Sequence, residues 1–138
     1  MFLKPSIEFE GQAEEALNFY KEVFNGEIDH LFRYADAPHP QSESLSEQQK
    51  QLIMNARIDF GMNKISVSDS LSNQKASAGN NIKLDLVLAI EEDVKPIFEA
   101  LAKGGNITFP LIKTFFSPNF GELTDKFGIH WSFMQMPE

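Results

Sequence analysis

Cysteine is absent from this 138-residue chain, so disulfides, zinc–thiolate sites and cysteine nucleophiles are excluded. Basic residues are in the minority, with 12 Lys and Arg against 20 Asp and Glu, which gives a net charge of -8. With no basic stripe, nucleic acid is not an expected partner. No apolar run approaches the roughly 20 residues that span a bilayer. The N-terminus also lacks the layout of a signal peptide, so we expect a cytoplasmic protein without a membrane partner.

The apolar pattern divides the chain into two halves with the same order of elements. The first half has a predicted helix over residues 13–24 and predicted strands at residues 2–9, 27–34, 52–60 and 64–68. The second half has a predicted helix starting near residues 91–93 and predicted strands at residues 82–90, 106–116, 121–124 and 129–135. A link rich in Ser, Asn and Gly, residues 69–80, separates the two halves.

Local signals add detail to these elements. Asn25-Gly26 predicts a left-handed cap at the end of the first helix. Pro96 fits the second helix only in its first turn, where a missing N–H is no loss. Alternation in the strand at residues 27–34 predicts that Ile28, His30 and Phe32 share one face. Residues 44–51 are a candidate short helix that a serine would cap.

The shared element order indicates a duplicated βαβββ module. The modules span approximately residues 1–70 and 80–138, and sequence identity between them is slight. Neither half could bury a sheet face alone, so we expect a single domain over residues 1–138 in which both modules share one core. The expected fold class is α+β.

A dense aromatic stretch, TFFSPNFGELTDKFGIHW, lies near the C-terminus. Together with GQAEEALNFYKEVFNGEI, RYADAP and GNNIKLDL, it resembles the PhnB-like family of the vicinal oxygen chelate superfamily, which includes glyoxalase and bleomycin-resistance proteins. The resemblance implies paired βαβββ modules that form a curled mixed sheet, and a homodimer. Some members carry a demethylubiquinone methyltransferase-like label, but this chain has no Gly-rich turn after a first strand to bind a methyl donor.

The resemblance also implies positions for a divalent metal, and the residues there do not match. Ile7 is expected at the first position, with Glu8 pointing the other way. The strand that opens the second half offers Lys83 and Asp85, and Ser132 stands in the approximate place of the usual carboxylate. We therefore expect no metal and no other cofactor.

Several side chains are candidate ligand contacts at the rim or floor of the expected cup, each with a structural alternative. His30 and Asn55 are candidates to orient a ligand by hydrogen bonding. Arg33 could clamp an anion or pair with a neighbouring acid, and Tyr34 stands beside it. Aromatic side chains could stack on a planar ligand or pack in the core or a dimer interface: Phe115, Phe116, Phe120 and Trp131.

Other residues favour structural roles. Asp125, in a Thr-Asp-Lys-Phe-Gly run, is expected to cap a turn with its own side chain. His39, between two prolines, is expected in a surface loop, and His130 on a strand that faces solvent or the sheet edge.

The predicted function is that of a small-molecule-binding protein, without a catalytic metal, for a partly apolar ligand. Two alternatives stay open. One is a lyase or oxygenase that binds a divalent metal through atypical ligands, and the other is a catalytically silent dimeric interaction protein.

Overall fold

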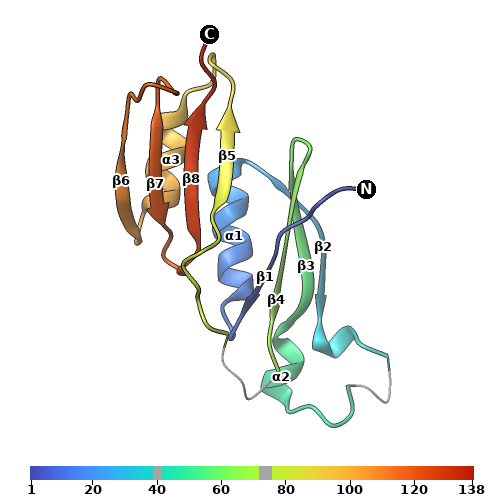
Figure 1. Cartoon of the computed structure of the whole chain (residues 1–138). Helices are drawn as coiled ribbons and strands as arrows, with labels where there is room; N and C mark the ends of the chain where they lie inside the picture. The colour runs from blue at the N-terminus through green and yellow to red at the C-terminus, as the bar shows by residue number, and fades with distance from the viewer. Residues whose placement is uncertain (39–41, 72–75) are drawn as a thin grey trace. The chain divides into compact units, whose positions relative to one another are not determined.

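The computed structural model describes residues 1–38, 42–71 and 76–138. These residues form two compact units, Met1–Ser77 and Ala78–Glu138 (Figure 1). The predicted surface position of His39, and the middle of the predicted link, residues 72–75, lie outside the described residues. In the described part of the chain, no helix is both long and apolar enough to cross a membrane.

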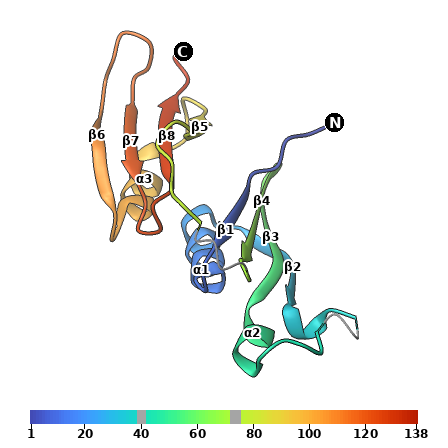
Figure 2. The ribbon, with the colours of Figure 1, turned by 60° about the horizontal axis from the view of Figure 1, so that its bottom comes forward.

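The first unit is a four-stranded mixed sheet with one long helix on it. Its strand order is β1-β4-β3-β2, in which β1 and β4 are parallel and the other pairs are antiparallel. Helix α1 contacts β3 and β4, and Figure 2 shows it along one face of the sheet. The elements are β1 (Ser6–Phe9), α1 (Ala13–Phe24), β2 (Glu27–Arg33), the 3-10 turn η1 (Tyr34–Asp36), α2 (Glu47–Gln51), β3 (Ile53–Phe60) and β4 (Asn63–Asp69).

The second unit repeats this arrangement. Its strand order is β5-β8-β7-β6, again with one parallel pair, β5 and β8, and α3 contacts β6 and β8. The predicted α+β fold with paired βαβββ modules is therefore confirmed. The elements are β5 (Leu84–Leu88), α3 (Val94–Ala102), β6 (Asn106–Ile112), β7 (Phe120–Thr124) and β8 (His130–Gln135).

Both long helices begin and end as their sequences predict. Asn25 closes α1 in the left-handed region, with φ 50°, and the N–H of Gly26 reaches back to the carbonyl of Lys21 at 2.9 Å. The Asp93 carboxylate caps α3 by accepting the N–H of Lys95, so Pro96 lies in the first turn.

Each helix buries an apolar stripe against its own sheet. In α1 the buried residues recur with helical spacing, and they are Ala13, Ala16, Leu17 and Tyr20. In α3, Phe98 packs edge-to-face on Phe133 of β8, with ring centroids 5.3 Å apart. Gly121 of β7 lies directly beneath Phe98, where an added Cβ would be 2.9 Å from the Phe98 ring. Glycine is thus what lets helix and sheet approach at this point.

Several boundaries differ from the sequence prediction: β1 begins at Ser6 rather than at residue 2, and β5 spans Leu84–Leu88 rather than residues 82–90. Strand β6 ends at Ile112 rather than at Phe116, because the N–H of Thr114 turns back to the carbonyl of Ser117 at 2.9 Å. The short helix α2 forms within the predicted segment, and its capping serine is Ser46, whose Oγ accepts the N–H of Gln49.

The predicted face of Ile28 in β2 is wrong because the strand contains a bulge, whereas His30 and Phe32 share one face as predicted. Ile28 pairs with Ile58, but the next partner in register, Arg57, pairs with His30. Asp29 is the extra residue, so the alternation is reset there. Ile28 consequently lies on the opposite face from His30, while Asp29 and His30 both contact the Arg57 side of the sheet.

The last residues of β4 and β8 occupy equivalent positions. In parallel register, Asp69 pairs with Phe9 at the end of β1, and Gln135 pairs with Leu88 at the end of β5. Asp69 accepts hydrogen bonds from the N–H groups of Gly11, Ala13 and Ile53. Gln135 does the reverse, because its amide Nε2 donates to the carbonyls of Ala89, Ile90 and Glu92. Each side chain ties its closing strand to the loop that precedes its helix.

Candidate functional site

Among the residues that the structure describes, one face of the first sheet carries no helix of the first unit. Ile65 and Val67 of β4 are buried, and Asp69 on the same strand bonds the start of α1, so all three point toward the helix. Because strand side chains alternate, Ser66 and Ser68 point to the other side. We call this side the unit-1 open face, and it bears Ser6, Glu8, Glu27, Asp29, His30, Phe32, Asn55, Arg57, Asp59, Lys64, Ser66 and Ser68.

Charged side chains form a continuous network across the unit-1 open face. Arg57 donates to both oxygens of Asp59, at 2.7 and 2.9 Å, and its Nη2 lies 3.0 Å from Asp29. Lys64 bonds the same Asp59 carboxylate at 3.1 Å. The hydrogen bond from Arg57 lowers the pKa of Asp59, and Lys64 adds to this effect. Both cations of this face are therefore engaged by carboxylates.

His30 and Asn55, both predicted ligand contacts, form a hydrogen-bonded pair on this face. The His30 Nε2 lies 2.6 Å from Asn55 Oδ1, and its Nδ1 lies 2.9 Å from Asp29 Oδ2. The imidazole also stacks on Phe32, with centroids 5.4 Å apart, and Phe32 is 49% exposed. The pair thus offers polar atoms beside an exposed ring, and its contact with a ligand stays a prediction.

Arg33 and Tyr34 are held by contacts of a different kind. The Arg33 guanidinium bonds the Glu14 carboxylate on α1 and the main-chain carbonyl of Gln51. Arg33 is thus fastened to the helix side of the sheet. The Tyr34 hydroxyl donates to the main-chain carbonyl of Asp69 at 2.7 Å. Burial raises the pKa of Tyr34, and the negative charges of Asp69 and Glu8 raise it further, so the phenol is a neutral donor at pH 7.

The second sheet also has a helix-free side, which grades from polar to apolar along its strands. One row across the sheet pairs Asp85 with Ser132, Ser132 with Glu122 and Glu122 with Phe109. The next row on the same side is apolar, and it consists of Val87, Met134, Phe120 and Ile112. We call this side, with these two rows and the adjoining Phe115 and Phe116, the unit-2 open face.

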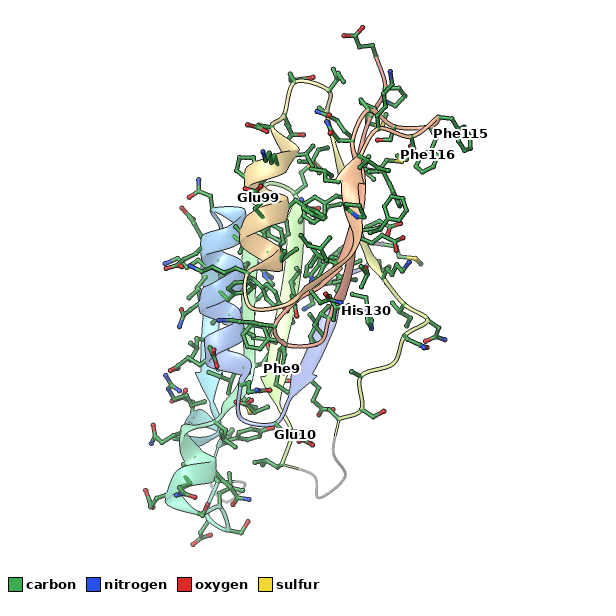
Figure 3. The ribbon with its side chains drawn as sticks, turned by 90° about the vertical axis from the view of Figure 1, so that its left-hand side faces the viewer. Phe9, Glu10, Glu99, Phe115, Phe116 and His130 are labelled. Atoms are coloured by element: carbon green, nitrogen blue, oxygen red, sulfur yellow. The ribbon has the colours of Figure 1, made fainter. Side chains whose placement is uncertain are left out.

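Aromatic rings run from the middle of this face to its edge. Phe109 packs on Phe120 at 5.6 Å, Phe120 on Phe116 at 5.1 Å, and Phe116 on Phe115 at 5.1 Å, all steeply inclined. Phe116 is 41% exposed and Phe115 fully exposed. Figure 3 shows both on the side of the second sheet away from α3. The structure therefore joins the three predicted phenylalanines, Phe115, Phe116 and Phe120, and adds Phe109.

Trp131, another predicted ligand contact, lies in the core of the second unit. It is 1% exposed, and its indole N–H donates to Asp125 Oδ2 at 2.9 Å. Asp125 Oδ1 accepts the N–H groups of Phe127 and Ile129. Asp125 is thus the turn-capping residue that the sequence predicts, and it also orients the indole. A ligand contact of Trp131 has not been tested and stays a prediction.

His130 lies beside Trp131 on the other side of β8. Its two ring nitrogens lie 2.9 Å from Thr124 Oγ1 and 2.9 Å from the carbonyl of Gly79. The histidine thus fastens the start of the second unit to the sheet.

The residues at the metal-ligand positions of the superfamily do not fit a divalent metal. Ser132 bonds the Asp85 carboxylate, and Lys83 pairs with Glu122 at 2.8 Å. Within the described ranges, no three His, Asp or Glu side chains gather as a metal site would require. The expected orientation of Glu8 is wrong by one position: Ile7 pairs with Val67 on the helix side, so Glu8 lies on the open face.

Sequence reasoning missed three residues of the unit-1 open face. Two of them, Arg57 and Asp59, stand two residues apart on one strand, and the alternation of strand side chains could have predicted that they share a face. The sequence around Ser66 gives no such signal, because the significance of Ser66 depends on its burial. It is 1% exposed, and its Oγ has no hydrogen-bond partner among the described residues.

Comparison with known proteins gives consistent relatives over the whole chain. The model of the 3-demethylubiquinone-9 3-methyltransferase family matches residues 2–134. Protein YjdN of Escherichia coli K12 is 28% identical over 138 aligned residues, covering 95% of this chain and 92% of YjdN. The crystal structure of PA1353 from Pseudomonas aeruginosa is 26% identical, with TM-score 0.86, covering 100% of this chain and 99% of PA1353.

Further solved structures extend the comparison. A PhnB protein from Bacillus cereus is 28% identical, with TM-score 0.80, covering 98% of this chain and 99% of that protein. A fosfomycin resistance protein, FosX from Listeria monocytogenes, is 12% identical with TM-score 0.62, covering 97% of this chain and 91% of FosX, and so shares the fold. The chain belongs to the PhnB-like 3-demethylubiquinone-9 3-methyltransferase family, within the vicinal oxygen chelate superfamily.

Proposed function

We propose that this chain binds a small, partly apolar molecule on the helix-free faces of its sheets, without a catalytic metal. The observation that carries the proposal is the graded unit-2 open face. There the rings of Phe109, Phe120 and Phe116 adjoin the Asp85–Ser132 and Lys83–Glu122 pairs. Partly exposed aromatic rings beside a few fixed polar groups are typical of ligand-binding surfaces.

The two kinds of residue have separate roles in the proposal. The phenylalanine rings supply apolar area, with Phe116 at 41% exposure offering a face for a planar ligand. On the unit-2 open face, the Asp85–Ser132 and Lys83–Glu122 pairs orient the ligand. The unit-1 open face, taken by itself, offers the polar atoms of the His30–Asn55 pair. The other predicted contacts, Arg33, Tyr34 and Trp131, bond protein groups, and their contact with a ligand stays a prediction.

A screen of small aromatic compounds by protein-observed NMR tests this function. Wild-type protein is compared with Phe116→Ala and with the control Phe2→Ala. Phe2 is a phenylalanine near the N-terminus that belongs to neither open face and, at 72% exposure, is more exposed than Phe116. We expect Phe116→Ala to weaken binding at least about tenfold, as loss of a stacked ring does, and Phe2→Ala to leave it unchanged. Equal affinities in all three proteins, or no binder at all, would contradict the proposal.

Chelation tests the metal-free part separately. The ligand affinity and melting temperature are measured before and after treatment with a chelator, and metal content is determined on protein purified without one. Unchanged values are expected. Stoichiometric metal, with a fall in melting temperature on chelation, would instead favour the metal-dependent lyase or oxygenase.

We also propose that the protein is a cytoplasmic homodimer. The fully exposed ring of Phe115 is apolar surface that a second copy could cover. Sedimentation of wild type and Phe115→Ser over a range of concentrations checks this: a dimer is expected for wild type. A wild-type monomer at all concentrations would refute it, and dimerisation with no ligand binding would favour the interaction-protein alternative.

A further inference from the structure

Ser66 has a buried side-chain hydroxyl with no hydrogen-bond partner among the described residues. It lies on the unit-1 open face between Ser6 of β1 and Arg57 of β3, the residues that pair with it in register. The residue is 1% exposed, and its Oγ makes no hydrogen bond within the described part of the chain. A buried hydroxyl left unpaired costs free energy, so such an atom in a folded protein requires an explanation.

The second unit shows which kind of partner is missing. By the register of the parallel strand pairs, Ser66 is equivalent to Ser132, and Ser6 is equivalent to Asp85. In the second unit, the Ser132 hydroxyl donates to the Asp85 carboxylate. In the first unit, serine replaces that aspartate, so the hydroxyl of Ser66 has no acceptor. Ser6 itself is exposed to solvent, whereas Ser66 is buried.

The charges around Ser66 exclude an anion as the natural acceptor. Four carboxylates of this face, those of Glu8, Glu27, Asp29 and Asp59, outnumber its two cations. Both cations, Arg57 and Lys64, already bond Asp59. A carboxylate or phosphonate group of a ligand would therefore be repelled by the net negative charge of this face. It would also find no guanidinium group that is not already bonded to a carboxylate.

The chain's other arginine does not change this conclusion. Arg33 and Arg57 are the only arginines in the sequence, and Arg33 is bonded to the Glu14 carboxylate. A cationic ligand group would suit the charge and could donate to Ser66 Oγ, but an ammonium has no lone pair to accept the Ser66 O–H, which would stay unpaired.

We infer that the unit-1 open face binds the neutral oxygen of a ligand, a carbonyl, amide or hydroxyl group, with Ser66 Oγ as its hydrogen-bond donor. This inference rests on the proposed small-molecule-binding function and specifies its ligand class. The ligand oxygen takes the place that the Asp85 carboxylate holds in the second unit. Asn55 on the neighbouring strand β3 and His30 on β2 beyond it are positioned to contact the remainder of the molecule.

Three probes that share one ring and differ in charge test the inference: benzamide, benzoate and benzylamine. Backbone amide shifts of the full chain are followed in titrations of wild type, Ser66→Ala, Ser6→Asp and Ser44→Ala. Ser6→Asp rebuilds the arrangement of the second unit and gives Ser66 an internal acceptor. Ser44→Ala is the control, because it removes an exposed serine hydroxyl that belongs to neither open face.

The inference predicts a specific pattern. Benzamide shifts the amides of β1 and β4 and binds wild type at least about tenfold more tightly than benzoate does. Ser66→Ala and Ser6→Asp each weaken benzamide about fivefold, the effect of one neutral hydrogen bond, and Ser44→Ala does not. Ser66→Ala also melts no lower than wild type, because it removes an unpaired buried hydroxyl; this result shows that its weaker binding is not caused by unfolding.

Three outcomes overturn the inference alone. The first is benzoate or benzylamine binding as tightly as benzamide, and the second is benzamide binding unchanged by both Ser66→Ala and Ser6→Asp. Benzamide shifts confined to the unit-2 open face would also overturn it while leaving the proposed binding function intact. If no probe and no compound of the wider aromatic screen binds, both proposals fall together.

Discussion

The Tyr34 hydroxyl donates a 2.7 Å hydrogen bond to the main-chain carbonyl of Asp69, while the carboxylate of the same Asp69 accepts three N–H groups. These donors come from the β1–α1 connection (Gly11), the first residue of α1 (Ala13) and the first residue of β3 (Ile53). One residue at the end of β4 thereby joins four parts of the first unit. Because Asp69 is 2% exposed, water cannot replace it.

Replacing Asp69 by alanine is expected to lower the free energy of unfolding by about 3 kcal/mol, since three buried or partly buried N–H groups lose their acceptor. Asp36→Ala is the control, because Asp36 is exposed and accepts a single N–H, that of Arg33. It should cost no more than about 1 kcal/mol. Urea unfolding followed by circular dichroism measures both, and equal costs would show that Asp69 is not the junction we describe.

Removing the Tyr34 hydroxyl should reduce stability in a pH-dependent way. The pKa of Tyr34 is raised above 10.0, first by burial and then by Asp69 and Glu8. The hydrogen bond therefore contributes fully below pH 10.0 and is lost as the pH rises through the raised pKa. At pH 7, Tyr34→Phe should cost about 1 kcal/mol, and this difference should shrink above pH 10.

The chain has two tyrosines, so absorbance at alkaline pH, recorded for wild type and Tyr34→Phe, isolates the titration of Tyr34. A stability difference between the two proteins that is constant from pH 7 to pH 11 would contradict the assigned hydrogen bond.

Arg57→Gln should raise the pKa of Asp59. The hydrogen bond from Arg57 is the largest cause of its lowered pKa, and Lys64 contributes less. The stabilisation from Asp59 is present above the ordinary value of 3.8 and is lost as the pH falls through the lowered pKa. Carboxyl-carbon NMR titration measures the shift directly. Lys64→Gln should give a smaller rise, and the opposite order would show that Arg57 is not the main partner.

Gly105→Ala should destabilise the second unit by about 2 kcal/mol or more, as overpacking against main chain does. An added Cβ would lie 2.2 Å from the carbonyl oxygen of Thr124 and 2.8 Å from the carbonyl carbon of Asp125. Gly79→Ala is the control, since its nearest neighbour would be the Asn81 side chain at an ordinary 3.5 Å. Thermal unfolding compares the two variants, and equal melting temperatures would contradict the close approach.

Sequence periodicity predicted the helices and most of the strands because each buries one regular stripe. Helix α1 and its Asn25 cap follow from residue spacing and turn chemistry alone. The bulge at Asp29 does not, because one extra residue reverses the alternation without any local composition signal. That single residue placed Ile28 on the wrong face.

The sequence predicted which residues belong to the candidate site better than it predicted the contacts that those residues make. His30 and Asn55 do meet, 25 positions apart, because their strands are neighbours. Arg33 looked equally suited to a ligand, but its partner Glu14 approaches from a helix, and strand pattern cannot reveal that contact. The importance of Ser66 follows only from its burial and its missing acceptor, which are properties of the fold.

The opposite polarity of Asp69 and Gln135 has a consequence for how this duplicated chain reaches its fold. If β8 took the place of β4 beside β1, the Gln135 side chain would offer a single oxygen. In Asp69, two carboxylate oxygens accept the N–H groups of Gly11, Ala13 and Ile53. If β4 paired with β5 instead, the Asp69 carboxylate would face the carbonyls of the β5–α3 connection and repel them. Two strands with the same position and similar apolar patterns are thereby made non-interchangeable. The chain can carry two copies of one architecture while each closing strand selects its own half during folding.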